Sequence, residues 1–390
     1  MSKEKTSVVF TGDIGFDRYM EQKWEDETLL SEEIIEFFKN ADHVLANVEG
    51  ALIAQEEAED VNNKGIFFHT MNPDATKLLD RIEADIWDFA NNHAMDAGAG
   101  GIKNAVKLAD KHGAQTIGAG QTIEEASKPA YLEEAGGIGF IGLGYMPTCV
   151  RATEEKAGVF GWDELDLIEK KIKEVKEKCR WCVVVCHGGE EFTTLPAPYT
   201  RNLYFKYLEF GADIVVSHHP HVPMNYERVG DKIIFYSLGN FIFDTDYHRA
   251  QPNTDMSVLI KINFTEDSYS FDALGTKIIR GEEKIVAGPL PDIFTDIQED
   301  EYNKLIPMGA KALLANERRK MCFMDANKYG NFTDDDWHDF FQDYKNGARI
   351  KNQLRDLALY EELAKQADNG LFETSELEKV KEYIVKQIID

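Results

Sequence analysis

Short apolar runs alternate with helical patterns from residue 6 to about residue 240. The runs at 7–13, 43–50 and 137–145 are nearly continuous in hydrophobic residues, which is typical of strands buried on both faces. Further strand-like runs lie at 84–93, 181–189, 212–222 and 232–241. Apolar residues at helical spacing predict helices at 31–40, 74–81, 100–112, 165–178 and 201–210, with Ser31 as an N-cap. This alternation predicts an α/β fold.

The pattern changes after about residue 250. Residues 258–264 and 269–279 alternate in polarity like antiparallel strands that extend the sheet. Residues 298–390 are highly charged and mostly helical in pattern, with few candidate catalytic groups. A chain of 390 residues can hold either two to three domains or one large domain with an extension. We expect a main domain at 1–297 and a charged helical C-terminal extension at 298–390.

Charge and composition narrow the classes of partner. The chain has 43 Lys and Arg against 70 Asp and Glu, a net charge of −27, which repels nucleic acids and anionic membranes. An anionic substrate remains possible if a bound cation supplies positive charge. The longest uncharged apolar stretch, 137–146, is shorter than the roughly 20 residues of a membrane span. With no signal-peptide pattern at the N-terminus and only five cysteines, we expect a cytoplasmic protein without a membrane anchor.

Polar residues recur where the predicted strands end. In open α/β sheets, ligands gather beyond the carboxyl ends of the strands. Each polar residue alone is an ordinary turn or structural residue, and two histidines separated by proline can be a surface pair. Together they supply oxygen and nitrogen ligands that suit Mn, Fe or Zn, and a pair of such ions can activate water. The residues are Asp13, Glu49, Asn92, His93, His187, His219 and His221.

Several motifs carry a resemblance to a known family. The segments are TGDIGFDR (11–18), ANVEGAL (46–52), FANNHAMDAG (89–98), VCHGGEEF (185–192), GADIVVSHHPHV (211–222) and FYSLGNFIFD (235–244). This order of motifs resembles the calcineurin-like metallophosphoesterases, and within them the CapA capsule and poly-γ-glutamate synthesis family. The resemblance covers roughly residues 6–245 and implies a four-layer α/β/β/α sandwich with metals at the strand ends.

The resemblance also implies roles for individual residues. Glu49 would bridge if two ions bind, and His93 would be an outer residue or a general acid held by Asp96. Glu190, Glu191 and Asn240 would line the pocket. The implied ligands of one or two divalent ions are Asp13, Glu49, Asn92, His187, His219 and His221. Two positions depart from the pattern: Gly15 stands where the wider superfamily usually has histidine, and Gly188 where family members often have tryptophan.

Two further features leave alternatives open. Arg201 can clamp a substrate carboxylate or phosphate, or it can be a charge on a helix surface. Cys179 and Cys182, followed by Cys186, invite a metal or redox interpretation, but a zinc ribbon needs a second pair at similar spacing. Cys182 and Cys186 share one face of a strand and are better explained as core residues.

These observations lead to two hypotheses of function. The first is a metal-dependent hydrolase that cleaves a phosphoester or a glutamyl-polymer amide, with metal-activated water as nucleophile and His93 as general acid. The second is a non-catalytic binding or assembly subunit for poly-γ-glutamate or capsule synthesis. The partner would be a small molecule or an anionic polymer, and the sequence leaves the oligomeric state open.

Overall fold

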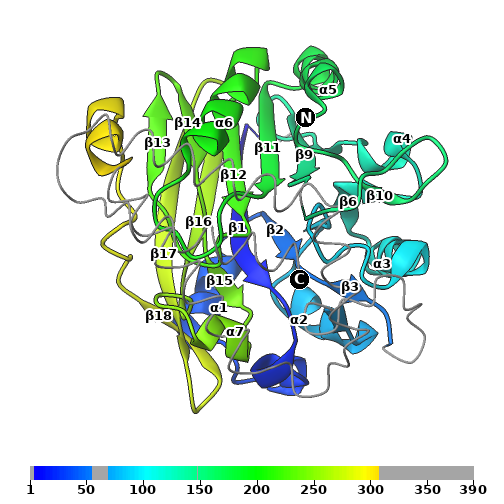
Figure 1. Ribbon diagram of the computed structural model, residues 1–390, viewed down its shortest axis with the longest axis vertical. Helices are drawn as coiled ribbons and strands as arrows, with labels where there is room; N and C mark the ends of the chain where they lie inside the picture. The colour runs from blue at the N-terminus through cyan, green and yellow to red at the C-terminus, as the bar shows by residue number, and fades with distance from the viewer. Residues whose placement is uncertain (1–3, 55–68, 147, 307–390) are drawn as a thin grey trace, which may run out of the picture.

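The computed structural model describes residues 4–54, 69–146 and 148–306, and two large mixed sheets dominate them (Figure 1). The first sheet has the strand order β18-β17-β16-β1-β2-β5-β6, and β15 pairs with β1 off this path. Its parallel part consists of β1 (Lys5–Ile14), β2 (His43–Val48), β5 (Ile86–Asp88), β6 (Gln115–Ile117) and β15 (Asn240–Ile242). The antiparallel part consists of β16 (Met256–Thr265), β17 (Tyr269–Ile279) and β18 (Lys284–Gly288).

The second sheet has the strand order β13-β14-β12-β11-β9-β8. Its central strands are parallel: β9 (Ile138–Gly144), β11 (Trp181–His187), β12 (Ile214–His218) and β14 (Lys232–Phe235). Antiparallel edge strands flank them: β8 (Ala130–Leu132) and β13 (Tyr226–Val229). Two small sheets pair β3 (Ala51–Leu52) with β4 (Thr70–Met71), and β7 (Ala119–Gly120) with β10 (Gly158–Val159).

Helices connect the strands and pack on the sheets. The α-helices are α1 (Glu32–Lys39), α2 (Thr76–Arg81), α3 (Gly98–His112), α4 (Ile123–Ala126), α5 (Leu165–Lys178), α6 (Pro198–Phe210) and α7 (Asp246–Arg249). Short 3₁₀ helices are η1 (Arg18–Met20), η2 (Lys23–Glu25) and η5 (Pro73–Ala75). The α/β fold predicted from the alternating pattern is therefore confirmed.

The apolar alternation within each strand explains the cores. In β1, Val8 and Phe10 point into a cluster that also contains Phe140 and Val183 of the second sheet. The intervening Val9 points the other way, into a cluster shared with α1, α2 and α3. On the second sheet, residues such as Val184 face a third cluster with α5 and α6. Because successive side chains of a strand point to opposite faces, each central strand needs apolar residues at every position.

Element boundaries follow local chemistry, with some differences from the sequence prediction. Helix α5 occupies the predicted 165–178, whereas α6 begins three residues before the predicted start, with Pro198 in its first turn. Ser31 occupies the N-cap position of α1, but its side chain makes no capping hydrogen bond. Instead, its hydroxyl accepts the N–H of Ala287 at 3.2 Å. The serine therefore ties α1 to β18 rather than capping the helix.

The run at 232–241 forms two strands instead of one. β14 belongs to the second sheet, and after a turn at Gly239, where φ is +75°, β15 pairs with β1 of the first sheet. In this register Asn240 lies opposite Asp13. Glycine tolerates this left-handed conformation at no steric cost, so the chain can change sheets here. The crossing brings a motif near residue 240 to the first strand.

The described chain ends in helical residues 299–306. Tyr302 and Ile306 pack into the cluster of the second sheet, and the Tyr302 hydroxyl donates to Pro196 O at 2.9 Å. The rest of the predicted extension, 307–390, lies outside the described residues, so the domain division stays a prediction. Among the described residues, no helix has both the length and the apolar character of a membrane span.

The inter-sheet core generates a stability prediction. Phe140 is fully buried and its ring faces that of Phe10 at a centroid distance of 6.3 Å. We expect Phe140→Ala to lower the free energy of unfolding by about 3–5 kcal/mol, because it removes apolar contacts and leaves a cavity between the sheets. Urea denaturation followed by circular dichroism measures this. The control is Lys170→Ala on α5, whose side chain is 69% exposed and should change little; equal effects of both variants would contradict the assignment of this core.

Candidate metal centre

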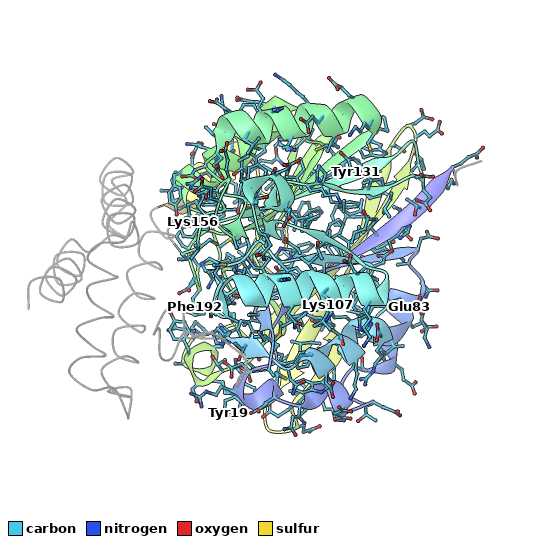
Figure 2. All side chains as sticks on the ribbon, turned by 90° about the vertical axis from the view of Figure 1, so that its right-hand side faces the viewer. Tyr19, Glu83, Lys107, Tyr131, Lys156 and Phe192 are labelled. Atoms are coloured by element: carbon cyan, nitrogen blue, oxygen red, sulfur yellow. The ribbon has the colours of Figure 1, made fainter. Side chains whose placement is uncertain are left out.

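The carboxyl ends of the parallel strands of both sheets bring the polar motifs together. Asp13 lies near the end of β1, and the Glu49 N–H donates to Ile14 O at 2.8 Å, which continues the pairing of β1 with β2. His187 ends β11, and His219 and His221 follow β12. Figure 2 shows Phe192, whose ring packs against His221, and Glu83, which precedes β5, at opposite edges of the molecule. The candidate site therefore lies at the edge predicted from the strand order.

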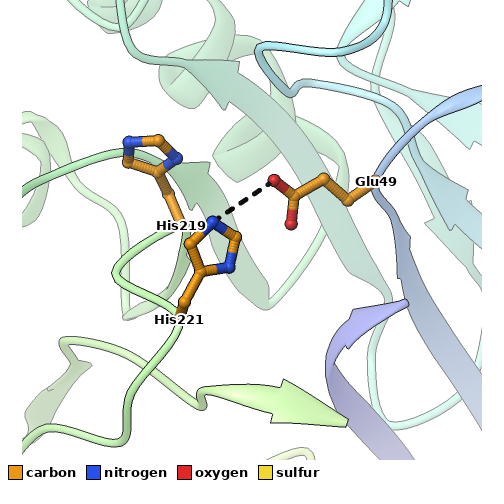
Figure 3. Close-up of side chains that lie close together, drawn as sticks. All are labelled: Glu49, His219 and His221. Atoms are coloured by element: carbon orange, nitrogen blue, oxygen red, sulfur yellow. Dashed lines mark ion pairs between the residues drawn. The ribbon is translucent and has the colours of Figure 1, made fainter. Parts of the chain in front are cut away.

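Two groups of buried side chains have ligand atoms close enough to hold a metal ion. One is Glu49, His219 and His221, and the other is Asp13, Glu49 and His187; within each group the atoms lie within 4.8 Å of one another. Glu49 belongs to both groups. Its Oε1 lies 3.5 Å from His187 Nε2 and 3.8 Å from His221 Nε2. Figure 3 shows the Glu49 carboxylate facing the His221 ring, with His219 beside it.

The donor set fits a cation because several of its atoms are buried without a hydrogen-bond partner. Both carboxylate oxygens of Glu49 lack one, as do Asp13 Oδ2 and His219 Nδ1. An unsatisfied buried polar group costs free energy, and a buried charge costs more unless it is paired or binds a metal. Carboxylate oxygens together with imidazole nitrogens suit a divalent transition metal. These residues therefore could hold such an ion.

The ionisation of the site reflects its crowded charges. Burial alone would raise the pKa of Asp13, but its contacts with His221 and the charges of nearby histidines lower that pKa to about 2. Burial opposes charge on His221 as well, yet Glu49 and Asp13 raise the pKa of His221 to about 9. Burial and His187 hold the pKa of His219 well below its usual range. Without a cation, His221 is therefore the charged partner of the two carboxylates.

The backbone of the histidine pair adopts an uncommon conformation. His219 has φ +93° and His221 has φ +58°, in a region that residues with a Cβ rarely enter. The Pro220 carbonyl between them accepts the Phe192 N–H at 2.8 Å, and His221 Nδ1 donates to Asn240 Oδ1 at 2.9 Å. Such conformations persist where the surrounding structure fixes them, and they cluster at functional sites. The turn around Pro220 brings both imidazoles close to the Glu49 carboxylate.

The segment after β5 adds a second layer of contacts. A hydrogen bond of 2.9 Å joins His187 Nε2 to Asn92 Oδ1. Asn91 fixes this segment, because its side-chain amide donates to Val48 O at 2.7 Å. His93 Nδ1 donates to Asp96 Oδ2 at 2.6 Å, and His93 Nε2 lies 4.0 Å from Glu49 Oε1. The structure thus brings Asn92, His93 and Asp96 to the candidate site.

Of the predicted pocket residues, Asn240 and Glu191 lie near the histidine pair, whereas Glu190 bonds its own segment. Asn240 contacts His221, and the charge of Glu191 acts on both His219 and His221. Glu190 is buried and accepts the Ala197 N–H at 3.1 Å and the Tyr199 hydroxyl, so it bonds its own segment. Burial raises the pKa of this carboxyl.

Arg201 follows neither alternative that the sequence left open. Its guanidinium donates to both carboxylate oxygens of Glu227, at 2.6 and 2.9 Å, and stacks on Phe205 and Tyr302. It is a buried ion pair in the packing of α6. Among the described contacts of Arg201, none reaches the residues of the candidate centre.

Side chains from elsewhere fill the positions left by the two departures from the family pattern. A Cβ at Gly15 would lie 2.7 Å from the Phe243 ring, which packs against His221. A Cβ at Gly188 would lie 2.8 Å from Tyr145 and 2.9 Å from Trp162. Trp162 and Tyr145 therefore occupy the space beside Gly188. Likewise, Phe243 leaves no room for a histidine at position 15.

Two histidines at the site carried no signal in the sequence. His69 packs against His93 with a centroid distance of 4.1 Å, and His248 packs against His221 at 4.5 Å. Neither belongs to a strand-end motif, and only the tertiary structure places them here. His218, which precedes the histidine pair, points toward the other sheet, where its Nε2 donates to Thr11 O at 2.8 Å. Cys182 and Cys186 are buried in the core of the second sheet, as expected.

Comparison with known proteins supports the resemblance seen in the motifs. The model of the family described as bacterial capsule synthesis protein PGA_cap matches residues 7–245. The PGA biosynthesis protein CapA of Bacillus subtilis is 30% identical over 269 residues, covering 68% of this chain and 70% of that protein. The capsule biosynthesis protein CapA of Bacillus anthracis is 27% identical over 297 residues, covering 74% and 71%.

A more distant relative has a different description. A probable polyglutamine synthesis accessory protein of Mycobacterium tuberculosis is 25% identical over 218 residues, covering 52% of this chain and 56% of that protein. The family match extends from the first strand through β15 and includes every residue of the two potential metal-binding groups. The chain belongs to the bacterial capsule synthesis protein (PGA_cap, CapA) family.

Proposed function

We propose that this protein is a metal-dependent hydrolase whose substrate is a phosphoester or an amide of a glutamyl polymer. The observation that carries the proposal is the Glu49 carboxylate, which is fully buried beside the histidines of two strand ends with no hydrogen-bond partner for either oxygen. A structural carboxylate would have hydrogen-bond partners, whereas a metal ligand keeps its oxygens available. The proposal includes the four-layer arrangement of the metallophosphoesterases and a cytoplasmic location, both of which stay predictions.

The proposed ligands are Asp13, Glu49, Asn92, His187, His219 and His221. When bound, one or two divalent ions of Mn, Fe or Zn supply Lewis acidity and lower the pKa of water. Asn240 orients the His221 ring through its 2.9 Å hydrogen bond. Glu191 lies close enough for its charge to act on His219, so it limits how much negative charge a substrate can bring to that side.

His93 is the proposed general acid for the leaving group. Asp96 accepts its Nδ1–H, which leaves Nε2 on the side of Glu49 to carry the transferred proton. Burial and the neighbouring His69 lower the pKa of His93. The protonated imidazole is therefore a stronger acid than usual, which favours proton transfer to a poor leaving group.

The second candidate function is a binding or assembly subunit for an anionic polymer. The specific observation in its favour is Phe243, which fills the space beside Gly15 where the wider superfamily usually has a histidine. Relatives named for capsule and PGA synthesis fit either function. Turnover of p-nitrophenyl phosphate, bis-p-nitrophenyl phosphate or a γ-glutamyl anilide with added Mn²⁺ favours the hydrolase. Saturable binding of poly-γ-glutamate without turnover favours the subunit.

Metal binding depends on the shared carboxylate and its histidines. We expect the purified protein to bind about one or two equivalents of Mn²⁺ or Zn²⁺, and His219→Ala or Asp13→Asn to reduce affinity at least tenfold. Elemental analysis and calorimetric titration measure both. His112→Ala is the control, because His112 bonds Asp80 at 2.6 Å on the surface of α3. If the wild-type protein takes up no metal, the hydrolase proposal fails.

The role of His93 makes a separate prediction. We expect His93→Ala to lower turnover of a substrate with a poor leaving group, such as phenyl phosphate, by about 10²–10⁴-fold. The loss should be smaller for p-nitrophenyl phosphate, whose leaving group needs less protonation, and metal content should stay the same. Steady-state kinetics on both esters test this. Equal loss on both, or no loss on either, would remove His93 as general acid.

A further inference from the structure

A second imidazole–carboxylate pair lies beside His93, outside the proposed ligands. His69 Nδ1 donates to Asp17 Oδ2 at 2.5 Å, and Asp17 Oδ1 accepts the Arg18 N–H at 2.7 Å. The His69 side chain is 11% exposed. With the His69 ring and the Arg18 backbone N–H as donors, Asp17 has a pKa below the usual range despite its burial. In this pair the charged Asp17 carboxylate therefore fixes the orientation of the His69 ring.

This pair connects to the His93–Asp96 pair in two ways. The same Asp96 oxygen that accepts His93 Nδ1–H also accepts the backbone N–H of His69, at 2.8 Å. The two rings are nearly perpendicular, at 78°, with centroids 4.1 Å apart. His69 also packs edge-on against Phe243, with ring centroids 5.1 Å apart. His69 thus contacts both Phe243 and His93, and the bond to Asp17 sets the rotation of its ring.

We propose that His69, held by Asp17, is a positioning residue that keeps the His93 ring with Nδ1 toward Asp96 and Nε2 toward Glu49. The role of His93 in proton transfer rests on the proposed function, but the orientation itself does not. An imidazole turns about a broad, roughly two-fold torsion, so a hydrogen bond at Nδ1 alone does not exclude the flipped ring. The nearly perpendicular His69 ring, with its centroid 4.1 Å from that of His93, packs against the ring that would have to turn and so hinders the flip.

Two substitutions separate the effect of the His69 ring from that of its hydrogen bond to Asp17. His69→Ala removes the ring that packs against His93 but keeps the backbone N–H that Asp96 accepts. Asp17→Asn keeps the ring and weakens the bond that fixes its rotation. His43→Ala is the matched control, because His43 Nδ1 bonds Asp85 Oδ2 at 2.5 Å and its side chain is 16% exposed. His43 starts β2, at the opposite end of the strand from Glu49.

The first measurement needs no substrate. In protein labelled with ¹⁵N-histidine, long-range ¹H–¹⁵N spectra at one alkaline pH report which ring nitrogen of each histidine carries the proton. The His93 signals are assigned by their loss in His93→Gln. We expect a single Nδ1–H form in the wild type and in His43→Ala, and mixed or broadened forms in His69→Ala. The spectrum of Asp17→Asn should be intermediate between those of the wild type and His69→Ala. If His69→Ala does not fold, Asp17→Asn alone provides the test.

The second measurement uses turnover. We expect His69→Ala to lower kcat for phenyl phosphate about tenfold, the size typical of losing a residue that orients a working histidine. In the His93→Ala background the same substitution should have no further effect. If His69→Ala folds and its His93 signals are unchanged, the positioning role is wrong. If His69→Ala does not fold, unchanged His93 signals in Asp17→Asn decide the same way. Absence of turnover in the wild type overturns the proposed function instead, and the spectra still decide the inference.

Discussion

The structure of this site depends on one buried carboxylate. Glu49 is inaccessible to solvent, and no hydrogen bond reaches either of its oxygens; imidazole nitrogens at 3.5–4.0 Å are its nearest charged partners. Burying polar oxygens without hydrogen-bond partners costs free energy, so contacts elsewhere must hold the surrounding elements in place. The apolar cluster between the two sheets does this, and the hydrogen bond from His218 to Thr11 joins the sheets directly below the site.

The same constraint explains the strained turn after β12. His219 and His221 both have positive φ values, which cost about 1–3 kcal/mol each at residues with a Cβ. In a regular strand the two side chains, two residues apart, would lie on one face about 7 Å apart. The turn instead brings ligand atoms of both histidines and of Glu49 within 4.8 Å of one another. Contacts from two other segments, Phe192 to the Pro220 carbonyl and Asn240 to His221, stabilise the turn. Rigid neighbours therefore sustain the conformation that brings the imidazoles together.

Aromatic residues define how this chain differs from the family pattern. Phe243, directly after β15, fills the place beside Gly15, and it packs against His69, His221 and His248. Trp162 and Tyr145 take the place beside Gly188. At Gly15 and Gly188, side chains from other segments thus form the surface that a larger residue at these positions would have supplied. One consequence is that a side chain missing from a motif does not imply a gap in the site.

The sequence by itself determined the α/β class, most strand and helix positions, and the polar strand ends, because buried strands require unbroken apolar runs and parallel strands end at one edge. It also pointed to Asp13, Glu49, the histidine that ends β11 and the two that follow β12. Only the tertiary structure decided the rest. The change of sheet within 232–241, the ion pair of Arg201 with Glu227, and the places of His69 and His248 depend on contacts between distant segments. Local sequence patterns do not predict such contacts, because which distant residues pair and become buried is decided only in the folded chain.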